Sequence, residues 1–98
     1  MGIIELKAKI RLETWRKYSK KLRNNGYIPG IIYGLNQSEI LTYFEKNSLM
    51  RISEDNTFLK SVILLHINKI TEKVKVQSIQ RHIFKKDILH IDFLRKIS

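Results

Sequence analysis

The residues of this chain whose types and spacing most directly suggest chemistry are His90 and Asp92, in the segment DILHIDFLRKIS. Side chains two residues apart on a β-strand share a face, so the imidazole and the carboxylate would lie side by side. Leu89, Ile91 and Phe93 alternate with them and would point to the other face. The spacing alone leaves three roles open for the pair: a catalytic dyad, a metal clip, or two groups that read a bound ligand.

Several requirements of an enzyme or a metal site are missing from the sequence. It contains no Cys, which excludes disulfide scaffolds, Cys-ligated zinc and thiol catalysis. No GxSxG or HExxH motif accompanies the pair, and a dyad would still need a nucleophile or a metal. His66, in the apolar run VILLHI, is interpreted as a half-buried histidine, and His82 as part of a basic surface turn. We therefore predict no catalytic residue and no metal site, and keep a ribonuclease that uses His90 with Asp92 as the enzymatic alternative.

The charge of the chain indicates a polyanionic partner. Nineteen Lys and Arg residues oppose nine Asp and Glu, a formal net charge of +10 on 98 residues. Contact between basic side chains and phosphates releases condensed counterions, so nucleic acid is the expected partner, with an acidic protein or a membrane surface as alternatives. Five of the positive charges lie between Arg16 and Arg23, where the nearest acid is Glu13, and this favours phosphate contacts.

A second group of residues is polar without being basic. Its members could donate and accept hydrogen bonds on base edges and ribose hydroxyls. They are Tyr33, Gln77, Gln80, His90 and Asp92. Phosphates would repel Asp92, so its expected role is to accept from a guanine amino group or a 2′-hydroxyl, or to orient His90 or an arginine.

The N-terminal part of the chain is predicted to supply a strand and a basic helix. Apolar residues alternate with charged ones over residues 4–12, the pattern of a half-buried strand. Trp15, Tyr18 and Leu22 then follow at helical spacing, and the NNG run that ends at Gly26 is typical of a helix end. We interpret this stripe as the packing face of the helix, with stacking on bases as the alternative for the two aromatic rings.

The rest of the chain is predicted to form strands with one further helix. Strands are expected at 27–34, 39–45, 57–67, 72–80 and 88–96, and a short helix at 48–55 with Asn47 or Ser48 as its cap. The apolar spacing slips after Val76, which indicates a bulge near Gln77 and Ser78. The predicted fold class is therefore mainly β (α+β): one domain over residues 1–98, built as a six-stranded closed β-barrel with two or three short helices.

Apolar runs in this sequence are too short to span a bilayer, and no signal-peptide pattern is present, so a cytoplasmic protein is expected. Three separated blocks carry a resemblance to a known family. The chain resembles the bacterial large-subunit ribosomal protein twenty-five family, in its short single-domain form, at SKKLRNNGYIPGIIYG, VKVQSIQRH and LHIDFLR. The resemblance runs along essentially the whole chain. It implies a barrel similar to the anticodon-binding barrel of glutaminyl-tRNA synthetase, and a structural rather than enzymatic role.

The resemblance also implies partners and site residues. The family binds the loop E region of 5S ribosomal RNA (5S rRNA), reads a widened minor groove there, and sits in the central protuberance of the large subunit. We therefore expect a monomer within the ribosome, with no membrane contact and no cofactor other than Mg²⁺ that accompanies the RNA. By matching positions, the residues expected to grip the RNA backbone are Arg11, Ser19, Lys20, Lys21 and Arg23, to which the charge pattern adds Arg16. Those expected to face the groove are Tyr33, Gln77, Gln80, His90 and Asp92.

The sequence departs from the family pattern in two places. A glycine-rich loop common in the family is replaced by TWRKYS, which changes how Arg16 and Lys17 would meet the RNA. The Pro that commonly follows QRH is Ile83 here, a change expected to affect only the turn. A regulatory protein whose basic patch binds a partner other than ribosomal RNA is the remaining alternative.

Overall fold

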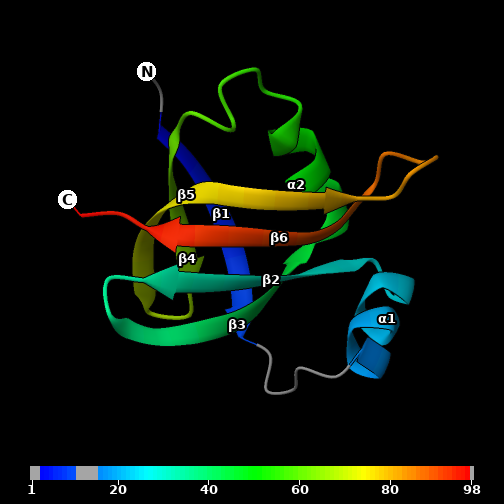
Figure 1. Ribbon diagram of the computed structural model, residues 1–98, viewed down its shortest axis with the longest axis horizontal. Coiled ribbons are helices and arrows are strands. Elements are labelled where there is room, and N and C mark those ends of the chain that lie inside the picture. Colours follow the sequence, from blue (N-terminus) through cyan, green and yellow to red (C-terminus); the bar gives the residue numbers. More distant parts are fainter. Residues whose placement is uncertain (1–2, 11–15, 98) are drawn as a thin grey trace.

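The computed structural model describes residues 3–10 and 16–97, and the side-chain surroundings of 3–10 and 20–97. Within these residues the chain forms a closed barrel of six strands with two helices at its periphery (Figure 1). The elements are β1 (Ile3–Ile10), α1 (Arg16–Asn24), β2 (Tyr27–Gly34), β3 (Gln37–Glu45), α2 (Lys46–Ser53), β4 (Val62–Ile67), β5 (Ile70–Arg81) and β6 (Ile88–Arg95). The predicted fold class is confirmed.

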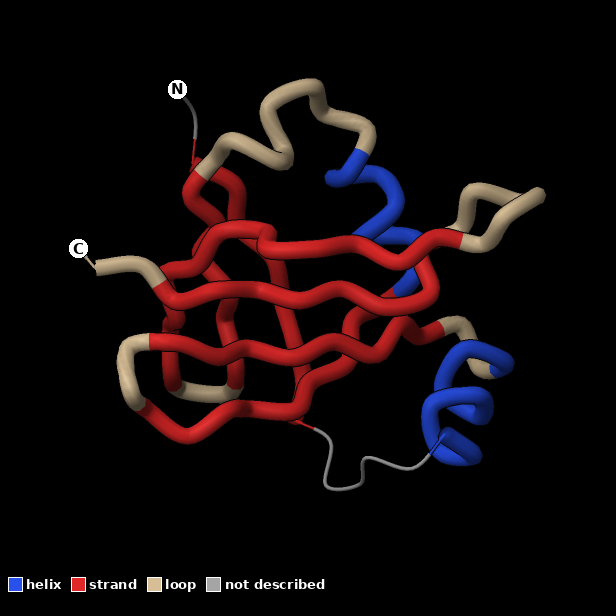
Figure 2. The backbone as a smooth tube through the Cα atoms, in the orientation of Figure 1, coloured by secondary structure: helices blue, strands red, loops and turns tan. Residues whose placement is uncertain are grey.

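The strands follow the order β1-β3-β2-β6-β5-β4 around the barrel, and β4 closes it by pairing with β1 (Figure 2). The β1–β4 and β2–β6 pairs are parallel, whereas the other neighbouring strands pair in antiparallel fashion. As a result β2, β6 and β5, which carry the predicted groove residues, are three consecutive strands of the barrel wall.

The interior of the barrel is filled by apolar side chains from every strand. Phe44 and Phe93 meet inside it with ring centroids 5.5 Å apart. Gly30 on β2 lies where a side chain would not fit, because a Cβ there would approach the Phe44 ring to 2.7 Å and the carbonyl oxygen of Ile91 to 2.8 Å. This close approach lets β2 and β6 run side by side beneath the predicted groove residues.

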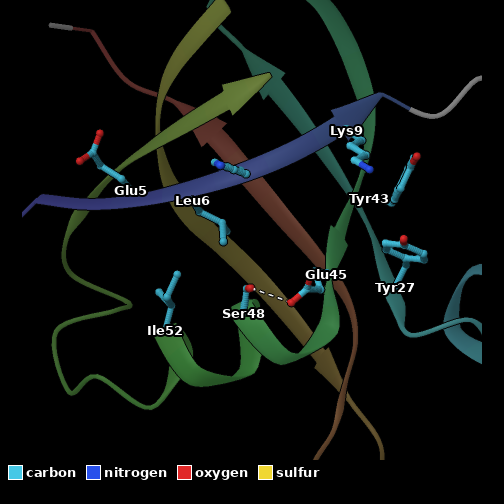
Figure 3. A pocket seen from close by; sticks show the side chains of 9 residues that line it. Glu5, Leu6, Lys9, Tyr27, Tyr43, Glu45, Ser48 and Ile52 are labelled. Carbon is cyan, nitrogen blue, oxygen red and sulfur yellow. Dashed lines mark hydrogen bonds between the residues drawn. The ribbon is translucent and has the colours of Figure 1, made fainter. Parts of the chain in front are cut away.

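Helix α2 closes part of the barrel, but its predicted cap is wrong. Leu49 is fully buried, and Met50 and Ile52 pack against the core as the sequence predicted. The helix follows β3 directly, which makes Glu45 the residue before its first turn. The Ser48 hydroxyl therefore lies inside the helix and donates to the Glu45 carboxylate at 3.0 Å (Figure 3).

The first strand and the basic helix are confirmed in the parts that the structure describes. Leu6 and Ala8 are buried as predicted, whereas Ile10, expected on the same side, is 43% exposed at the end of β1. α1 ends before Gly26, whose φ of +86° suits a residue without a side chain. The predictions made for Arg11 and Trp15 lie outside the described residues, as do those for the side chains of Arg16, Tyr18 and Ser19.

A pocket of about 350 Å³ lies between β1, α2 and one end of β2 and β3 (Figure 3). Lys7 and Lys9 of β1 line it together with Tyr27 and Tyr43, whose rings meet edge to face at 5.1 Å. Because β1 and β6 are three strands apart in the ring of six, this pocket is on the opposite wall from His90 and Asp92.

Candidate nucleic-acid interface

The predicted groove residues of β5 and β6 come together on the outside of the barrel. Ile91 and Phe93 are fully buried, so His90 and Asp92, which alternate with them, face outward. Gln80 of β5 lies opposite His90 in the sheet. Directly paired residues of antiparallel strands present their side chains on the same face, so these groups form one continuous polar surface.

Strand β2 adds Tyr33 to this surface. Ile32 is fully buried, which turns Tyr33 outward, and Tyr33 is in register with Leu94 of β6. Ile31, also half-buried and on the outer side, is in register with Asp92. We define the polar face as Tyr33, Ser78, Gln80, His90 and Asp92.

The His90–Asp92 pair forms as the spacing predicted, but with a third member. His90 Nδ1 lies 3.0 Å from Asp92 Oδ1, and the two side chains are 32% and 29% exposed. The other carboxylate oxygen, Oδ2, accepts a hydrogen bond from the Ser78 hydroxyl at 3.2 Å. The carboxylate is thus held on both oxygens, which fixes its direction and orients the imidazole ring.

Ser78 was missed by the sequence reasoning, although the feature that places it was predicted. The register between β5 and β6 shifts between Val76 and Ser78, which confirms the expected bulge. Without the bulge, Gln77 would lie opposite Asp92; with it, the residue opposite is Ser78. The slip in apolar spacing was the available signal, but its effect on Asp92 required knowledge of which strands pair.

Gln77 is set apart from the other predicted groove residues. It is exposed, and it lines a hollow of about 510 Å³ between β5 and residues 53–59. Ser78 and Arg81 also line this hollow, so Gln77 lies beside the polar face, at its border with the loop that follows α2.

Helix α1 lies at one end of the barrel, next to the start of β6 (Figure 1). Lys20 and Lys21 are exposed, while Leu22 is buried, as the predicted packing stripe requires. Arg23 was predicted to grip phosphates; its guanidinium Nη1 donates to the carbonyl oxygen of Leu89 at 3.2 Å. This bond ties the helix to the residue that precedes His90.

A small basic hollow of about 220 Å³ lies between α1 and the start of β6. Arg23, Lys46 and Lys85 line it together with Asp87. Lys46 Nζ lies 2.7 Å from Asp87 Oδ2. The hydrogen bond from Lys46, aided by the charges of Lys46, Lys85 and His82, holds the pKa of the Asp87 carboxyl below its ordinary value.

Comparison with known proteins identifies the family. The model of the Ribosomal L25p family matches residues 6–93. The chain belongs to the ribosomal L25p family. The match spans the polar face, the exposed part of α1 and the loop between β5 and β6.

Several bacterial members of the L25p family align with nearly the whole chain. Large ribosomal subunit protein bL25 of Buchnera aphidicola (from Acyrthosiphon pisum, strain Tuc7) is 38% identical over 92 residues, which cover 94% of this chain and 97% of the relative. The bL25 protein of Edwardsiella ictaluri is 36% identical over 90 residues, or 92% and 96% of the two chains. That of Laribacter hongkongensis is 35% identical over 92 residues, which cover 94% of this chain and 50% of the relative.

Membership of the L25p family confirms that the protein is a structural component of the bacterial ribosome, located in the cytoplasm, and not an enzyme. The His90–Asp92 pair is therefore not a catalytic dyad. Among residues 3–10 and 16–97, no group of three or more His, Asp or Glu side chains is arranged to hold a metal ion. No helix in the same part of the chain is long and apolar enough to cross a membrane.

Proposed function

We propose that the chain binds the loop E region of 5S rRNA within the central protuberance of the large ribosomal subunit. The polar face enters the widened minor groove, while α1 and the segment before it contact the phosphates. Residues 1–98 act as one RNA-binding domain and as a monomer within the ribosome. The names of the relatives, all large ribosomal subunit proteins, support the assembly part of this proposal.

The observation that carries the proposal is the fixed carboxylate of Asp92. A chain with a net charge of +10 places this acid in the middle of a polar surface, held by His90 and Ser78. A carboxylate is repelled by phosphates but accepts hydrogen bonds from guanine N2 amino groups and ribose 2′-hydroxyls. Both donors are displayed in the wide, shallow minor groove of A-form RNA, so the polar face fits a groove rather than a phosphate ridge.

The position of α1 supports the phosphate part of the proposal. Lys20 and Lys21 are exposed on the helix, and the Arg23–Leu89 hydrogen bond fixes the helix beside β6. Phosphates flank the minor groove, so cations beside the polar face would meet the backbone while Asp92 meets base edges and sugars. The arrangement thus divides affinity, supplied by α1, from recognition, supplied by the strands.

The shape of the polar face favours folded RNA over a single strand. Proteins that bind single strands without sequence preference stack bases on aromatic rings. Tyr33 is the aromatic residue of the polar face, and it is half-buried at one edge of the surface. Hydrogen-bonding groups at fixed positions along two strands instead match the groove of an RNA helix, where the bases and sugars also have fixed positions.

The test is a titration of the chain with three RNAs at the same salt concentration: 5S rRNA, its isolated loop E fragment, and a perfect duplex of the fragment's length. We expect the first two to bind with similar affinity and the duplex to bind at least tenfold more weakly. Each missing or mismatched contact in a specific complex costs about 1–3 kcal/mol, which is the basis for that margin. Equal affinity for all three RNAs would contradict specific recognition of loop E.

A further inference from the structure

The loop between β5 and β6 carries the two most exposed apolar side chains among the described residues. Ile83 is 86% exposed and Phe84 is 87% exposed. We call these two adjacent residues the apolar tip. A single exposed apolar residue is common on protein surfaces, but an adjacent pair that includes an aromatic ring, at the end of a projecting loop, indicates a contact with another molecule.

The backbone that supports the apolar tip is fixed by hydrogen bonds within the loop. The backbone N–H groups of Phe84 and Lys85 both donate to His82 Nδ1 at 3.2 Å. His82 N–H donates to the Asp87 carbonyl at 2.8 Å, and Lys86 N–H donates to the His82 carbonyl at 3.2 Å. The tip is therefore held away from the barrel by its own loop, and ordering it on binding would cost little entropy.

A further hydrogen bond closes the loop from the side of β5. Arg81 Nη1 donates to the Lys86 carbonyl at 2.9 Å, and Lys86 has a left-handed backbone with φ of +59°. The contact between Asp87 and Lys46 attaches the other end of the loop to the start of α2. Both ends of the loop are thus anchored, and Ile83 and Phe84 project between them.

The charges around the apolar tip favour RNA over a protein as the occupant. Arg81, Lys85 and Lys86 are neighbours of the tip in sequence and are exposed. The one acid of the loop, Asp87, is already paired with Lys46. Three cations around an aromatic side chain match a base with its flanking phosphates, because phosphates need cations and every base offers a face for stacking.

The position of the loop makes the RNA of the proposed function the nearest candidate. The loop continues β5 and β6 past Gln80 and His90, the last register pair of the polar face at this end of the barrel (Figure 1). An RNA helix that lies along the polar face would extend past this end of the sheet. The apolar tip would meet the same RNA beyond the groove segment that the polar face covers.

We propose that the apolar tip is a second RNA contact, in which the Phe84 ring stacks on a base outside the groove segment read by the polar face. Lys85 and Lys86 contact the phosphates on either side of that base. This inference rests on the proposed function, since it places the tip on the same RNA. It adds a stacking contact that the His90–Asp92 surface does not provide.

The experiment compares Phe84→Ala and Phe84→Trp with matched changes at Ile70, an exposed residue (55%) at the turn between β4 and β5, at the other end of the barrel. In titrations with 5S rRNA, Phe84→Ala should weaken binding roughly 5- to 150-fold, the range for loss of one base–aromatic stack. The slope of log K against log salt should stay the same because no charge is removed. Ile70→Ala should leave affinity and slope unchanged.

The tryptophan variants report the contact directly. Emission of Phe84→Trp should be quenched when 5S rRNA is added, after subtraction of the signal from Trp15 measured in the parent chain. Emission of Ile70→Trp should not respond. If the parent chain binds 5S rRNA but both Phe84 variants behave like the Ile70 variants, the tip contact is wrong and the tip faces a protein or solvent. If the parent chain does not bind 5S rRNA at all, the proposed function fails and the tip contact with it.

Discussion

Two histidine–carboxylate pairs lie on opposite walls of this barrel, and their surroundings differ. His90 and Asp92 are 3.0 Å apart on β6. His66 of β4 lies 2.8 Å from the Glu5 carboxylate of β1, and its other ring nitrogen is 3.1 Å from the Thr71 hydroxyl. The two pairs have the same chemistry and similar lengths, so neither the residue types nor the distance assigns a function.

The neighbours of each pair make the difference. Asp92 is flanked by Ser78 and by the other residues of the polar face, with α1 attached to the residue before His90. Glu5 and His66 connect the parallel strands β1 and β4, next to the pocket lined by tyrosines. A histidine beside an acid is therefore informative only together with the surface around it, and the two pairs serve as matched controls for one another.

The largest expected effects come from the core behind each pair. Phe93→Ala and Leu65→Ala remove fully buried side chains next to Asp92 and His66, and each should lower the free energy of unfolding by about 2–5 kcal/mol. At a temperature where both variants remain folded, Phe93→Ala alone should also weaken binding to 5S rRNA, because it loosens the strand that holds Asp92. Chemical denaturation and RNA titration measure the two quantities. Equal loss of RNA affinity in both variants would contradict the claim that only the wall with His90 and Asp92 binds RNA.

Asp92→Ala and Glu5→Ala compare the two acids directly. Asp92→Ala should weaken binding to loop E RNA by roughly 1–3 kcal/mol, with little effect on a perfect duplex, because it removes a fixed acceptor. Glu5→Ala should change neither affinity. Fluorescence anisotropy with labelled RNAs measures the affinity for loop E RNA and for the duplex. A similar loss of loop E affinity in Glu5→Ala would contradict the claim that the two acids differ in function.

Lys21→Ala tests whether α1 contacts phosphates while the polar face recognises base edges and sugars. Loss of one phosphate contact should weaken binding to loop E RNA and duplex alike, and should reduce the slope of log K against log salt by up to about one unit. Lys69→Ala, an exposed lysine in the turn between β4 and β5, is the control and should leave the slope unchanged. A loss of affinity limited to loop E RNA would mean that Lys21 takes part in specific recognition instead.

Ser78→Ala asks how far the hydrogen bond to Asp92 matters. Removing this single bond should cost about 0.5–1.5 kcal/mol of affinity for loop E RNA, less than Asp92→Ala, because the carboxylate remains but is held on one side only. Thr71→Val removes the corresponding hydroxyl beside His66 and should not affect binding. Isothermal titration calorimetry on the two variants decides the point, and a Ser78→Ala effect equal to that of Asp92→Ala would mean that Ser78 itself contacts the RNA.

The smallest expected effect is on the pH dependence of stability. The folded-state pKa of Asp87 is lowered by Lys46, so the ion pair stabilises the fold above the ordinary carboxyl pKa of about 3.8 and is lost as the pH falls through the lower folded value. Asp87→Asn should therefore slightly lower Tm at pH 7, and the difference from the parent should shrink below about pH 4. A series of thermal melts from pH 2 to pH 7 tests this. A difference that stays constant down to pH 2 would show that the ion pair is not its source.

Local patterns predicted most of the elements because each pattern depends on neighbouring residues in sequence. The strand containing His90 and Asp92, the bulge at Ser78 and the end of α1 at Gly26 follow from spacing and turn preferences. Contacts between distant parts of the chain could not be obtained in this way. The bond from Arg23 to Leu89 depends on tertiary packing.

Arg95 is a second example of a tertiary contact that local sequence patterns could not predict. From its charge it would be expected on the surface, yet it is 5% exposed. Its guanidinium donates to the carbonyls of Gly34 and Ser38 at 3.0 and 2.7 Å, and lies 3.5 Å from the Glu72 carboxylate. It therefore holds the turn between β2 and β3 against the end of β6. Only the closed barrel brings these four residues together.

The parallel pairing of β2 with β6 has a consequence for protein synthesis. Tyr33 is synthesised well before the strand beside it, Ile88–Arg95. The barrel wall that holds Tyr33 next to β6 therefore cannot form on a nascent chain until β6 has been made. Because contacts between distant residues form late and slowly, the surface that we propose binds RNA is completed only once β6 is available to pair with β2. A growing chain that still lacks β6 thus cannot capture its RNA through the polar face.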